Sequence, residues 1–441
     1  MNMTYKEAMD YISSVGRFGS NYGLERTFRL LELLGSPHEK IKLIHIAGTN
    51  GKGSTTAMIT KILRGLGYKV GMYTSPYLEE FEERIQINGE NINKDTLVNL
   101  LEEVKIAINK VIEEGYEHPT EFEIITALMF LHFYNEKVDY GVIEVGLGGR
   151  LDSTNVLIPK VSLITSISLD HMNILGDNLR DIAKEKAGII KDGVPVILYP
   201  QKKEVEEVIL KIAKEKNSKV YMVKKEAGRL SDINYEDLYQ NVEIESYKNQ
   251  YTIKLPLLGE HQILNLNVAL NTIEVLCEQE KIKFDKNLVE KSLEDVKWIG
   301  RLEVLGKKPT IVIDGAHNID GIKALRKNIE KYFKYNKIYL LLGILADKQV
   351  KEMIEEIALI AEKIYALTPH SERAELSEDL KNEILKYNPN TIAFESYEEA
   401  FLLALKEANE EDLILISGSL YMIGDMRKII TKKLYGFGTL Y

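Results

Sequence analysis

The chain of 441 residues holds a single cysteine, Cys277, so no disulfide framework can form within it. The apolar helical pattern around Cys277 predicts a core position for it. No apolar run approaches the ~18 residues that a membrane-spanning helix needs. The N-terminal segment also lacks the basic and apolar regions of a signal peptide. We therefore expect a soluble protein of a reducing compartment, the cytoplasm, that does not associate with membranes.

An excess of basic residues is also missing, because 57 Lys and Arg face 67 Asp and Glu for a net charge of −10. Binding to nucleic acid through phosphate contacts requires basic surfaces, so a nucleic-acid partner is not expected. Short-period repeats and low-complexity tracts are absent as well. What the chain does have is 45% hydrophobic residues, enough for large cores in two or three domains.

A glycine-rich loop, residues 48–55 (GTNGKGST), follows the apolar run 41–47 and precedes a helical pattern over 56–66. This order of strand, loop and helix is typical of a phosphate-binding loop. Glycines let backbone N–H groups close around phosphate oxygens, and the helix N-terminus adds a favourable dipole. The loop therefore predicts nucleotide binding.

Three side chains give this loop its expected chemistry. Lys52 supplies a positive charge, and Ser54 or Thr55 supplies a hydroxyl for phosphate or Mg²⁺. The loop departs from the common G-x-x-x-x-G-K-[ST] pattern, because its first gap is shorter and Gly53 separates Lys52 from Ser54.

Polar side chains follow three further apolar runs where each predicted strand ends: Ser75, Glu144 and His171. Ligands of open α/β sheets gather at these ends, so the three side chains are expected near the phosphate loop. A carboxylate in an apolar strand is costly unless it is paired or metal-bound, which favours Glu144 as a metal ligand. Taken singly, Ser75 could be a turn residue and His171 a structural histidine. A histidine ligand would also suit Mn²⁺.

Two other patterns allow both a structural and a functional interpretation. Thr120 and Glu123 have the spacing of a helix capping box. The loop 17–23 (RFGSNYG) is either a surface turn or a substrate-side loop near the phosphate site. Lys186 lies in a helical pattern, and its spacing alone predicts a solvated surface lysine.

A domain boundary is expected near Trp298, which divides the chain into residues 1–297 and 298–441. From residue 310 onward, five strand–helix units alternate and predict a doubly wound parallel sheet. The DGAHN stretch, residues 314–318, follows the first of these strands. It is either a helix N-cap loop or a functional cluster of acid, histidine and amide.

Eleven stretches, in this order, resemble the folate branch of the Mur ligase superfamily, the folylpolyglutamate synthases that often double as dihydrofolate synthases. They are GTNGKGS (48–54), TSPYL (74–78), ERIQING (83–89), TEFEIIT (120–126), IEVGLGGRLDSTNV (143–156), SISLDHMNILG (166–176), IAKEKAGIIK (182–191), GEHQILN (259–265), WIGRLE (298–303), DGAHN (314–318) and SGSLY (417–421). The resemblance implies an α/β chain with an N-terminal P-loop domain of the Mur ligase type and a C-terminal Rossmann-like domain.

Two features separate this chain from the cell-wall enzymes of the same superfamily. Gly53 follows Lys52, where the muramyl ligases have threonine, and the 47 residues before the loop are too few for a UDP-binding domain. The chain departs from the folate branch at Tyr77, where histidine is frequent, and at Ile299, where proline is common.

The resemblance also implies roles for particular residues. Those implied to bind ATP are Thr49, Asn50, Gly51, Lys52, Gly53, Ser54, Asn265, Arg301 and Asp314. Those implied to hold Mg²⁺ are Ser54, Ser75, Glu144, His171 and Lys186, the last as a carbamate. The residues implied in catalysis are Lys52, Lys186 and His317, with His317 near the transferring phosphate or the incoming amino acid. Those implied on the folate side are Thr120, Phe122, Glu123 and Asp152.

The implied activity is that of an ATP-dependent ligase. It adds L-glutamate to a folate, with dihydropteroate as a second candidate substrate, through an acyl phosphate. ATP and Mg²⁺ are the expected cofactors, with Mn²⁺ and a monovalent cation such as K⁺ as further candidates. The expected partners are small molecules only, and the expected state is a monomer. The alternatives are a muramyl-peptide ligase and a P-loop switch protein.

Overall fold

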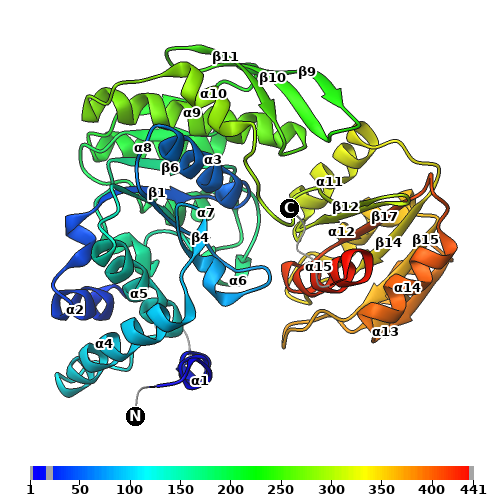
Figure 1. Cartoon of the computed structure of the whole chain (residues 1–441), viewed down its shortest axis with the longest axis horizontal. Helices are drawn as coiled ribbons and strands as arrows, with labels where there is room; N and C mark the ends of the chain where they lie inside the picture. Colours follow the sequence, from blue (N-terminus) through cyan, green and yellow to red (C-terminus); the bar gives the residue numbers. More distant parts are fainter. Residues whose placement is uncertain (1–2, 16–22, 437–441) are drawn as a thin grey trace.

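A computed structural model describes residues 3–15 and 23–436 as two lobes, each built around a mainly parallel sheet (Figure 1). Residues 16–22, which make up most of the expected substrate-side loop, lie outside the described residues. Helices cover both faces of each sheet, as expected for strands that read as continuous apolar runs.

The N-terminal lobe contains, within the described residues, a sheet of eight strands in the order β4-β3-β2-β5-β1-β6-β7-β8. The parallel strands are β1 (Lys42–Ala47), β2 (Val70–Tyr73), β5 (Tyr140–Glu144), β6 (Val161–Ile164), β7 (Val196–Leu198) and β8 (Val220–Met222). Two short antiparallel strands, β3 (Ile85–Ile87) and β4 (Glu90–Asn91), close one edge. Residues 83–89 alternate in the sequence as a strand would, but the observed strand is shorter, because Phe81–Arg84 form a capped 3-10 helix (η3).

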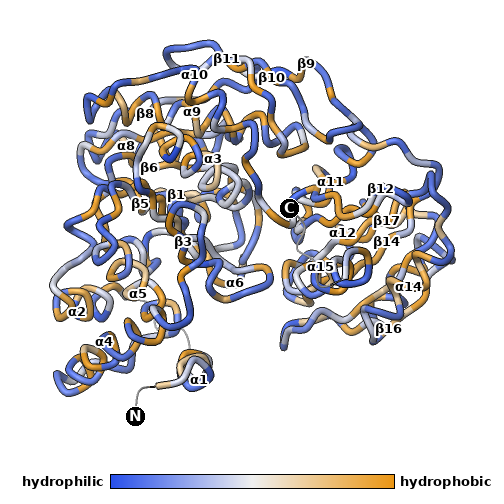
Figure 2. Tube along the Cα trace, in the orientation of Figure 1, coloured by the Kyte–Doolittle hydropathy of each residue, from blue (hydrophilic) through white to orange (hydrophobic). Residues whose placement is uncertain are grey.

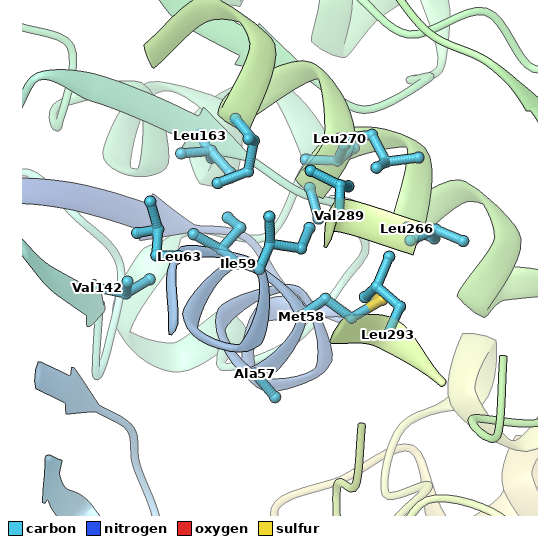
Figure 3. Packing of buried hydrophobic residues seen from close by; sticks show 14 of the residues in the cluster. Ala57, Met58, Ile59, Leu63, Val142, Leu163, Leu266, Leu270, Val289 and Leu293 are labelled. Carbon is cyan, nitrogen blue, oxygen red and sulfur yellow. The ribbon is translucent and has the colours of Figure 1, made fainter. Parts of the chain in front are cut away.

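Successive residues of β1 point to opposite faces of this sheet, as the pleat requires. Ile44 and Ile46 belong to a core with α3, α9 and α10, whereas Leu43 belongs to a second core with α4 and α5. Figure 3 shows the first core, where side chains of α3 interdigitate with those of α9 and α10. The phosphate loop is thus held between a buried strand and a buried helix.

The helices of this lobe are α1 (Tyr5–Val15), α2 (Glu25–Leu33), α3 (Lys52–Gly65), α4 (Lys94–Glu113), α5 (Glu121–Asn135), α6 (Met172–Leu175), α7 (Leu179–Ala187), α8 (Lys203–Glu215), α9 (Glu260–Glu280) and α10 (Lys286–Leu293). Two more 3-10 helices are η2 (Pro37–Lys40) and η4 (Ser153–Val156). Cys277 lies buried in α9, as its sequence context predicted.

A small antiparallel sheet lies beside α9 and is formed by β9 (Gly228–Asn234), β10 (Tyr239–Glu245) and β11 (Gln250–Leu255). The alternating pattern that ends the stretch 224–250 predicts an antiparallel hairpin, and the structure adds a third strand whose alternate residues, such as Ile253, enter the core. This sheet also contacts the C-terminal lobe, because Tyr332 Oη donates a hydrogen bond of 2.7 Å to Gln240 Oε1.

The C-terminal lobe has, in the part of the chain that the structure describes, a six-stranded sheet in the order β12-β13-β17-β14-β15-β16. Its strands are β12 (Glu303–Lys307), β13 (Thr310–Asp314), β14 (Ile338–Leu342), β15 (Lys363–Leu367), β16 (Thr391–Phe394) and β17 (Leu413–Ser417). All except β12 are parallel. The sequence did not predict β12, which pairs antiparallel with β13 at the edge.

The helices of the C-terminal lobe lie on both faces of its sheet. Those on one face are α11 (Ile319–Tyr332), α12 (Val350–Ile357) and α13 (Ser377–Ile384), and those on the other are α14 (Tyr397–Glu407) and α15 (Leu420–Tyr435). A short 3-10 helix, η5 (Ala358–Ile360), follows α12. The doubly wound fold predicted from five strand–helix units is confirmed.

Hydrophobic and hydrophilic segments alternate along the whole trace in Figure 2. Across residues 3–15 and 23–436, no helix combines the length and the apolar character needed to span a membrane.

Candidate active site between the two lobes

The phosphate loop connects the C-terminal end of β1 to α3, which begins at Lys52. Gly51 has a φ of 88°, a left-handed conformation that favours glycine, and a Cβ there would lie 2.5 Å from Asn265 Oδ1. Asn265, on α9, therefore closes over the loop from the opposite side. The amide and the loop form one surface, as expected for two implied ATP contacts.

Steric crowding explains why a glycine stands at position 53. A Cβ at this position would lie 2.5 Å from Cζ2 of Trp298, the single tryptophan of the chain. Trp298 lies between α10 and β12, so the linker between the lobes packs against the first turn of α3. In this structure only a residue without a side chain fits between Lys52 and Ser54.

Lys52, at the start of α3, and Glu144, at the end of β5, lie close to each other. Lys52 Nζ donates a hydrogen bond of 3.3 Å to the carbonyl of Thr49 and lies 3.8 Å from Glu144 Oε1. Burial raises the pKa of Glu144 to about 7, although the positive charges of Lys52 and Arg301 oppose this. Glu144 is thus a buried carboxylate, and the neighbouring positive charges compensate its negative charge only in part.

Lys186 is buried, and its Nζ donates a hydrogen bond of 2.8 Å to the carbonyl of Gly48. Burial, and then the neighbouring charge of Lys52, lower the pKa of Lys186 to about 7. Among the described residues it forms no ion pair with a carboxylate within 4.0 Å. The surface position that spacing alone predicted for Lys186 is therefore wrong.

A polar network joins the two lobes beside His171. Asp170 Oδ1 lies 2.5 Å from Lys348 Nζ, and both side chains are buried. Asp170 Oδ2 accepts a hydrogen bond of 3.2 Å from Asn318 Nδ2 and lies 3.7 Å from His317 Nε2. Because Lys348, His317 and Asn318 belong to the C-terminal lobe, this network holds that lobe against the loop that carries His171.

The DGAHN stretch caps a helix, as one of its two interpretations predicted. Asn318 caps α11 by accepting a hydrogen bond of 2.8 Å from Gly321 N, and its amide also donates to Asn50 Oδ1 at 3.1 Å. Asp314 is buried and accepts hydrogen bonds of 2.9 Å from the backbone N–H groups of Leu302 and Ala316. The stretch therefore orders both the helix start and the wall that faces the phosphate loop.

A cavity of about 380 Å³ lies between the lobes, walled by the phosphate loop, the ends of β1, β2 and β5, α9 and the DGAHN stretch. The implied ATP-binding, metal-binding and catalytic residues all line it: Thr49, Asn50, Gly51, Lys52, Gly53, Ser54, Ser75, Glu144, His171, Lys186, Asn265, Arg301, Asp314 and His317. Sequence positions more than two hundred residues apart thus meet in one cleft.

A second cavity, of about 730 Å³, adjoins the first. Thr120, Phe122 and Asp152 line it, and Asp152 accepts hydrogen bonds from Leu147 N at 2.8 Å and Thr154 N at 3.0 Å. The two cavities share wall residues: Ser75, Pro76, Gly146, Leu147, Gly148, His171, Leu175, His317 and Leu420. A molecule in one cavity can therefore touch a molecule in the other.

Glu123 is absent from the walls of both cavities as far as the described residues go. It forms a capping box with Thr120, accepts a hydrogen bond from Thr27 and pairs with Arg26 at 3.0 Å. The structural interpretation of the T-x-x-E spacing is confirmed. These contacts account for the buried carboxylate, and a folate-side role for Glu123 stays a prediction.

Residues 46–273 match the Mur ligase middle domain, and residues 300–420 match the Mur ligase glutamate ligase domain. The chain is 36% identical to the dihydrofolate synthase/folylpolyglutamate synthase of Bacillus subtilis over 97% of this chain and 99% of that protein. It is 35% identical to the folylpolyglutamate synthase of Lacticaseibacillus casei, again over 97% and 99%. The chain belongs to the folate branch of the Mur ligase family.

Solved structures of this branch of the Mur ligases share the fold over nearly the whole chain. The folylpolyglutamate synthase of Mycobacterium tuberculosis complexed with ADP and AMPPCP has a TM-score of 0.89 at 28% identity, covering 99% of this chain and all of that one. An FPGS–AMPPCP–folate complex has a TM-score of 0.86 at 32% identity, covering 97% and 99%.

The residues of this Mur ligase fit a divalent cation on the wall of the cavity that holds the phosphate loop. Among the described residues, no group of three or more His, Cys, Asp and Glu side chains forms a ready metal site. The expected ligand set is mixed and needs no such group, because it combines hydroxyl, carboxylate, imidazole and a modified lysine. The incompletely compensated carboxylate of Glu144 is the observation that favours a cation here.

Sequence reasoning missed Asp170, Lys348 and Trp298 as parts of the site. Asp170 precedes His171 at a strand end and carried the same signal as its neighbour. Lys348 follows β14 in the second lobe, so its partner could not be found without knowing how the lobes meet.

Proposed function

We propose that the chain is an ATP-dependent acid–amino-acid ligase that adds L-glutamate to a carboxylate of a folate, with dihydropteroate as a second candidate acceptor. One observation carries this proposal. A cavity lined by a phosphate loop shares a wall with a second, larger cavity, at the place where two lobes meet. Such a junction suits transfer of a phosphoryl group from ATP to a second bound substrate.

The residues of the first cavity hold and neutralise the nucleotide. Backbone N–H groups of residues 48–54 surround the phosphates, and Lys52 brings its positive charge to the γ-phosphoryl group. Arg301, Asn265 and Asp314 contact the nucleotide from the opposite wall. This arrangement is supported by the position of all these residues on one cavity.

The reaction passes through an acyl phosphate. A carboxylate oxygen of the folate attacks the γ-phosphorus, and the bond from that phosphorus to the bridging oxygen of ADP breaks. The neutral amine of L-glutamate then attacks the acyl carbon, and the bond from that carbon to the phosphate oxygen breaks. The departing phosphate takes one amine proton as the amide forms. His317 lines both cavities, so we assign it to the transferring phosphoryl group or to the incoming amino acid.

Mg²⁺ is the proposed cation, and its ligands are Ser54, Ser75, Glu144, His171 and a carbamylated Lys186. When bound, it would supply positive charge to the phosphates. Burial of Lys186 without a carboxylate partner supports the carbamate, which would turn a buried cation into an anionic ligand. Mn²⁺ could replace Mg²⁺, and K⁺ is a candidate for a monovalent site.

The second cavity is the proposed folate side, with Thr120, Phe122 and Asp152 on its wall. The proposed domains are 1–297 and 298–441, supported by the irregular linker between Leu293 and Glu303. We further propose a cytoplasmic monomer that acts on small molecules and does not bind nucleic acid or membranes.

Phosphate release from ATP tests the proposal when L-glutamate and each acceptor are supplied in turn. We expect release only with L-glutamate together with tetrahydrofolate or dihydropteroate, and the accepted pair identifies the substrate. Release that needs neither compound would instead indicate a P-loop switch. Activity only with a UDP-muramyl peptide would indicate a cell-wall ligase.

A further inference from the structure

The segment from Thr74 to Arg84, here called the docking loop, is held together by one side chain. Glu83 accepts hydrogen bonds from the backbone N–H groups of Leu78, Glu79 and Glu80, at 2.7, 3.0 and 2.9 Å. Three charge-assisted bonds to one carboxylate make this part of the loop rigid. It is therefore able to move as a unit.

The tip of the docking loop lies in a slot on the C-terminal lobe. A Cβ at Gly424 of α15 would lie 2.0 Å from the carbonyl oxygen of Leu78, and one at Gly300 would lie 3.1 Å from Cδ2 of Leu78. The side chain of Leu78 packs against the core between α15 and the sheet. Small residues on α15 and on the linker thus let the tip of a loop from the other lobe approach their backbones.

Ion pairs fasten the same contact. Arg427 of α15 reaches Glu79 through Nη1 at 2.8 Å and Glu303 of β12 through Nη2 at 2.7 Å. Lys428 donates a hydrogen bond of 2.6 Å to the carbonyl of Glu79 and lies 3.1 Å from the carboxylate of Glu80. The side chains of Arg427, Glu79 and Glu303 are 16%, 20% and 19% exposed, so water screens them much less than a surface pair.

The opposite end of the docking loop forms part of the active site. Ser75, Pro76 and Tyr77 line the cavity of the phosphate loop, whereas Arg427 and Glu79 do not. The loop therefore connects a contact on α15 to the hydroxyl that is proposed to hold Mg²⁺. Its contact with Glu79 therefore gives Arg427 a route to that hydroxyl through the loop.

We propose that Arg427 is a positioning residue, which fixes the docking loop to α15 and so brings Ser75 to its place only when the C-terminal lobe is seated. The inference rests on the proposed function for its kinetic consequence. Seating of the C-terminal lobe then completes the phosphate site in the N-terminal lobe, so ligation can proceed only when that lobe is seated. A purely stabilising ion pair would have no such effect on the rate.

Two measurements on Arg427→Gln test the proposal in the full-length protein. Hydrogen exchange of the segment 74–84, without ligands, should become faster. In steady-state ligation, kcat should fall about tenfold to a hundredfold, because misplacement by about 1 Å carries a penalty of that size. KM for ATP should change less than kcat, because Arg427 reaches the nucleotide side only indirectly, through Glu303, which accepts a hydrogen bond from Gly300 N beside Arg301.

Arg326→Gln is the matched control, since Arg326 pairs with Glu356 inside the C-terminal lobe. It should alter neither the exchange nor kcat. Glu79→Gln should reproduce the effects of Arg427→Gln, and the double variant should be no worse than either single one. Glu79→Gln also decides the matter if Arg427→Gln does not fold. Unchanged exchange in 74–84, or additive losses of kcat, would overturn the proposal, whereas a wild-type protein without ligase activity would overturn only the proposed function.

Discussion

The residues of the phosphate loop differ in what holds them in place. Lys52 is fixed by the carbonyl of Thr49 and by the distant carboxylate of Glu144, and no other acid lies within 4.0 Å of its ammonium among the described residues. Its charge is therefore available to a ligand. Gly53 is fixed by the indole of Trp298, so the shape of the loop depends on a residue from the linker.

Lys52→Ala should abolish ATP-dependent ligation and leave the fold intact. Loss of a preorganised positive charge at a transferring phosphoryl group lowers kcat by about a hundredfold or more. Phosphate release measures the loss, and circular dichroism checks the fold. Lys184→Ala, at an exposed lysine paired with Asp181, should leave both unchanged. Normal turnover of Lys52→Ala would refute the assignment of the loop.

Gly53→Ala should weaken nucleotide binding, because its Cβ would meet the ring of Trp298 at 2.5 Å. Overpacking of this kind costs about 1 to 3 kcal/mol, and 1.4 kcal/mol is about tenfold in affinity. Titration with ADP measures the change. Trp298→Leu removes the indole ring. Adding Gly53→Ala to Trp298→Leu should therefore lower the ADP affinity by less than Gly53→Ala does in the unmodified protein. If the two substitutions are additive, the steric explanation is wrong.

The sequence predicted which residues line the cavity where a single strand end carried the signal. Glu144 and His171 lie at the ends of apolar runs, and the rule that ligands gather at strand ends predicts that they share one cleft, as they do. Lys186 could not be found in this way, because its burial depends on the packing of α7 against the carbonyl of Gly48. Only the resemblance to the Mur ligases singled it out.

Among the elements, helix α5 shows how one carboxylate joins several parts of the N-terminal lobe. Glu123 closes the first turn of α5 and pairs with Arg26 of α2 at 3.0 Å, and both side chains are buried. The capping spacing was visible in the sequence, so the start of α5 was predicted at the correct residue. The ion pair was not visible, because it joins residues that are far apart in the chain.

Arg26→Ala should lower the free energy of unfolding by about 3 kcal/mol, because it leaves Glu123 buried without its cation. Urea denaturation followed by circular dichroism measures this change. Arg180→Ala is the control, since Arg180 and Glu207 form an exposed pair for which we expect a change of less than about 1 kcal/mol. If the free energy of unfolding falls equally in the two variants, the buried pair with Glu123 stabilises the fold no more than the exposed pair does.

Edge elements were predicted less well than central ones. The apolar run over 310–314 predicts the inner strand β13 with its observed bounds, because both faces of that strand are buried. Strand β12 has a partly exposed pattern and a glycine, and its pairing with β13 includes a register shift. A short edge strand of this kind has too little periodicity to be recognised.

At the scale of the whole molecule, the two lobes are joined by separate polar contacts. One is the network around Asp170 and Lys348, and a second is the hydrogen bond between Tyr332 and Gln240. These contacts join residues that lie more than ninety positions apart, so the sequence could predict two domains but not how they meet. The cleft forms only where the two lobes contact each other.

Lys348→Met should let the lobes separate, because it leaves Asp170 buried without the lysine that pairs with it across the interface. We expect a larger radius of gyration by small-angle X-ray scattering. Lys337→Met, which removes a lysine paired with Glu362 inside the C-terminal lobe, should leave the scattering unchanged. A scattering profile identical to that of the unmodified protein would show that the pair does not hold the lobes together.

The position of Trp298 has a practical consequence. Because it is the single tryptophan in the chain, intrinsic fluorescence excited through indole comes from one place, the linker where it packs on the phosphate loop. The protein therefore carries its own optical reporter. A change in emission on adding nucleotide reads out the contact between linker and loop directly, in real time and without any attached dye.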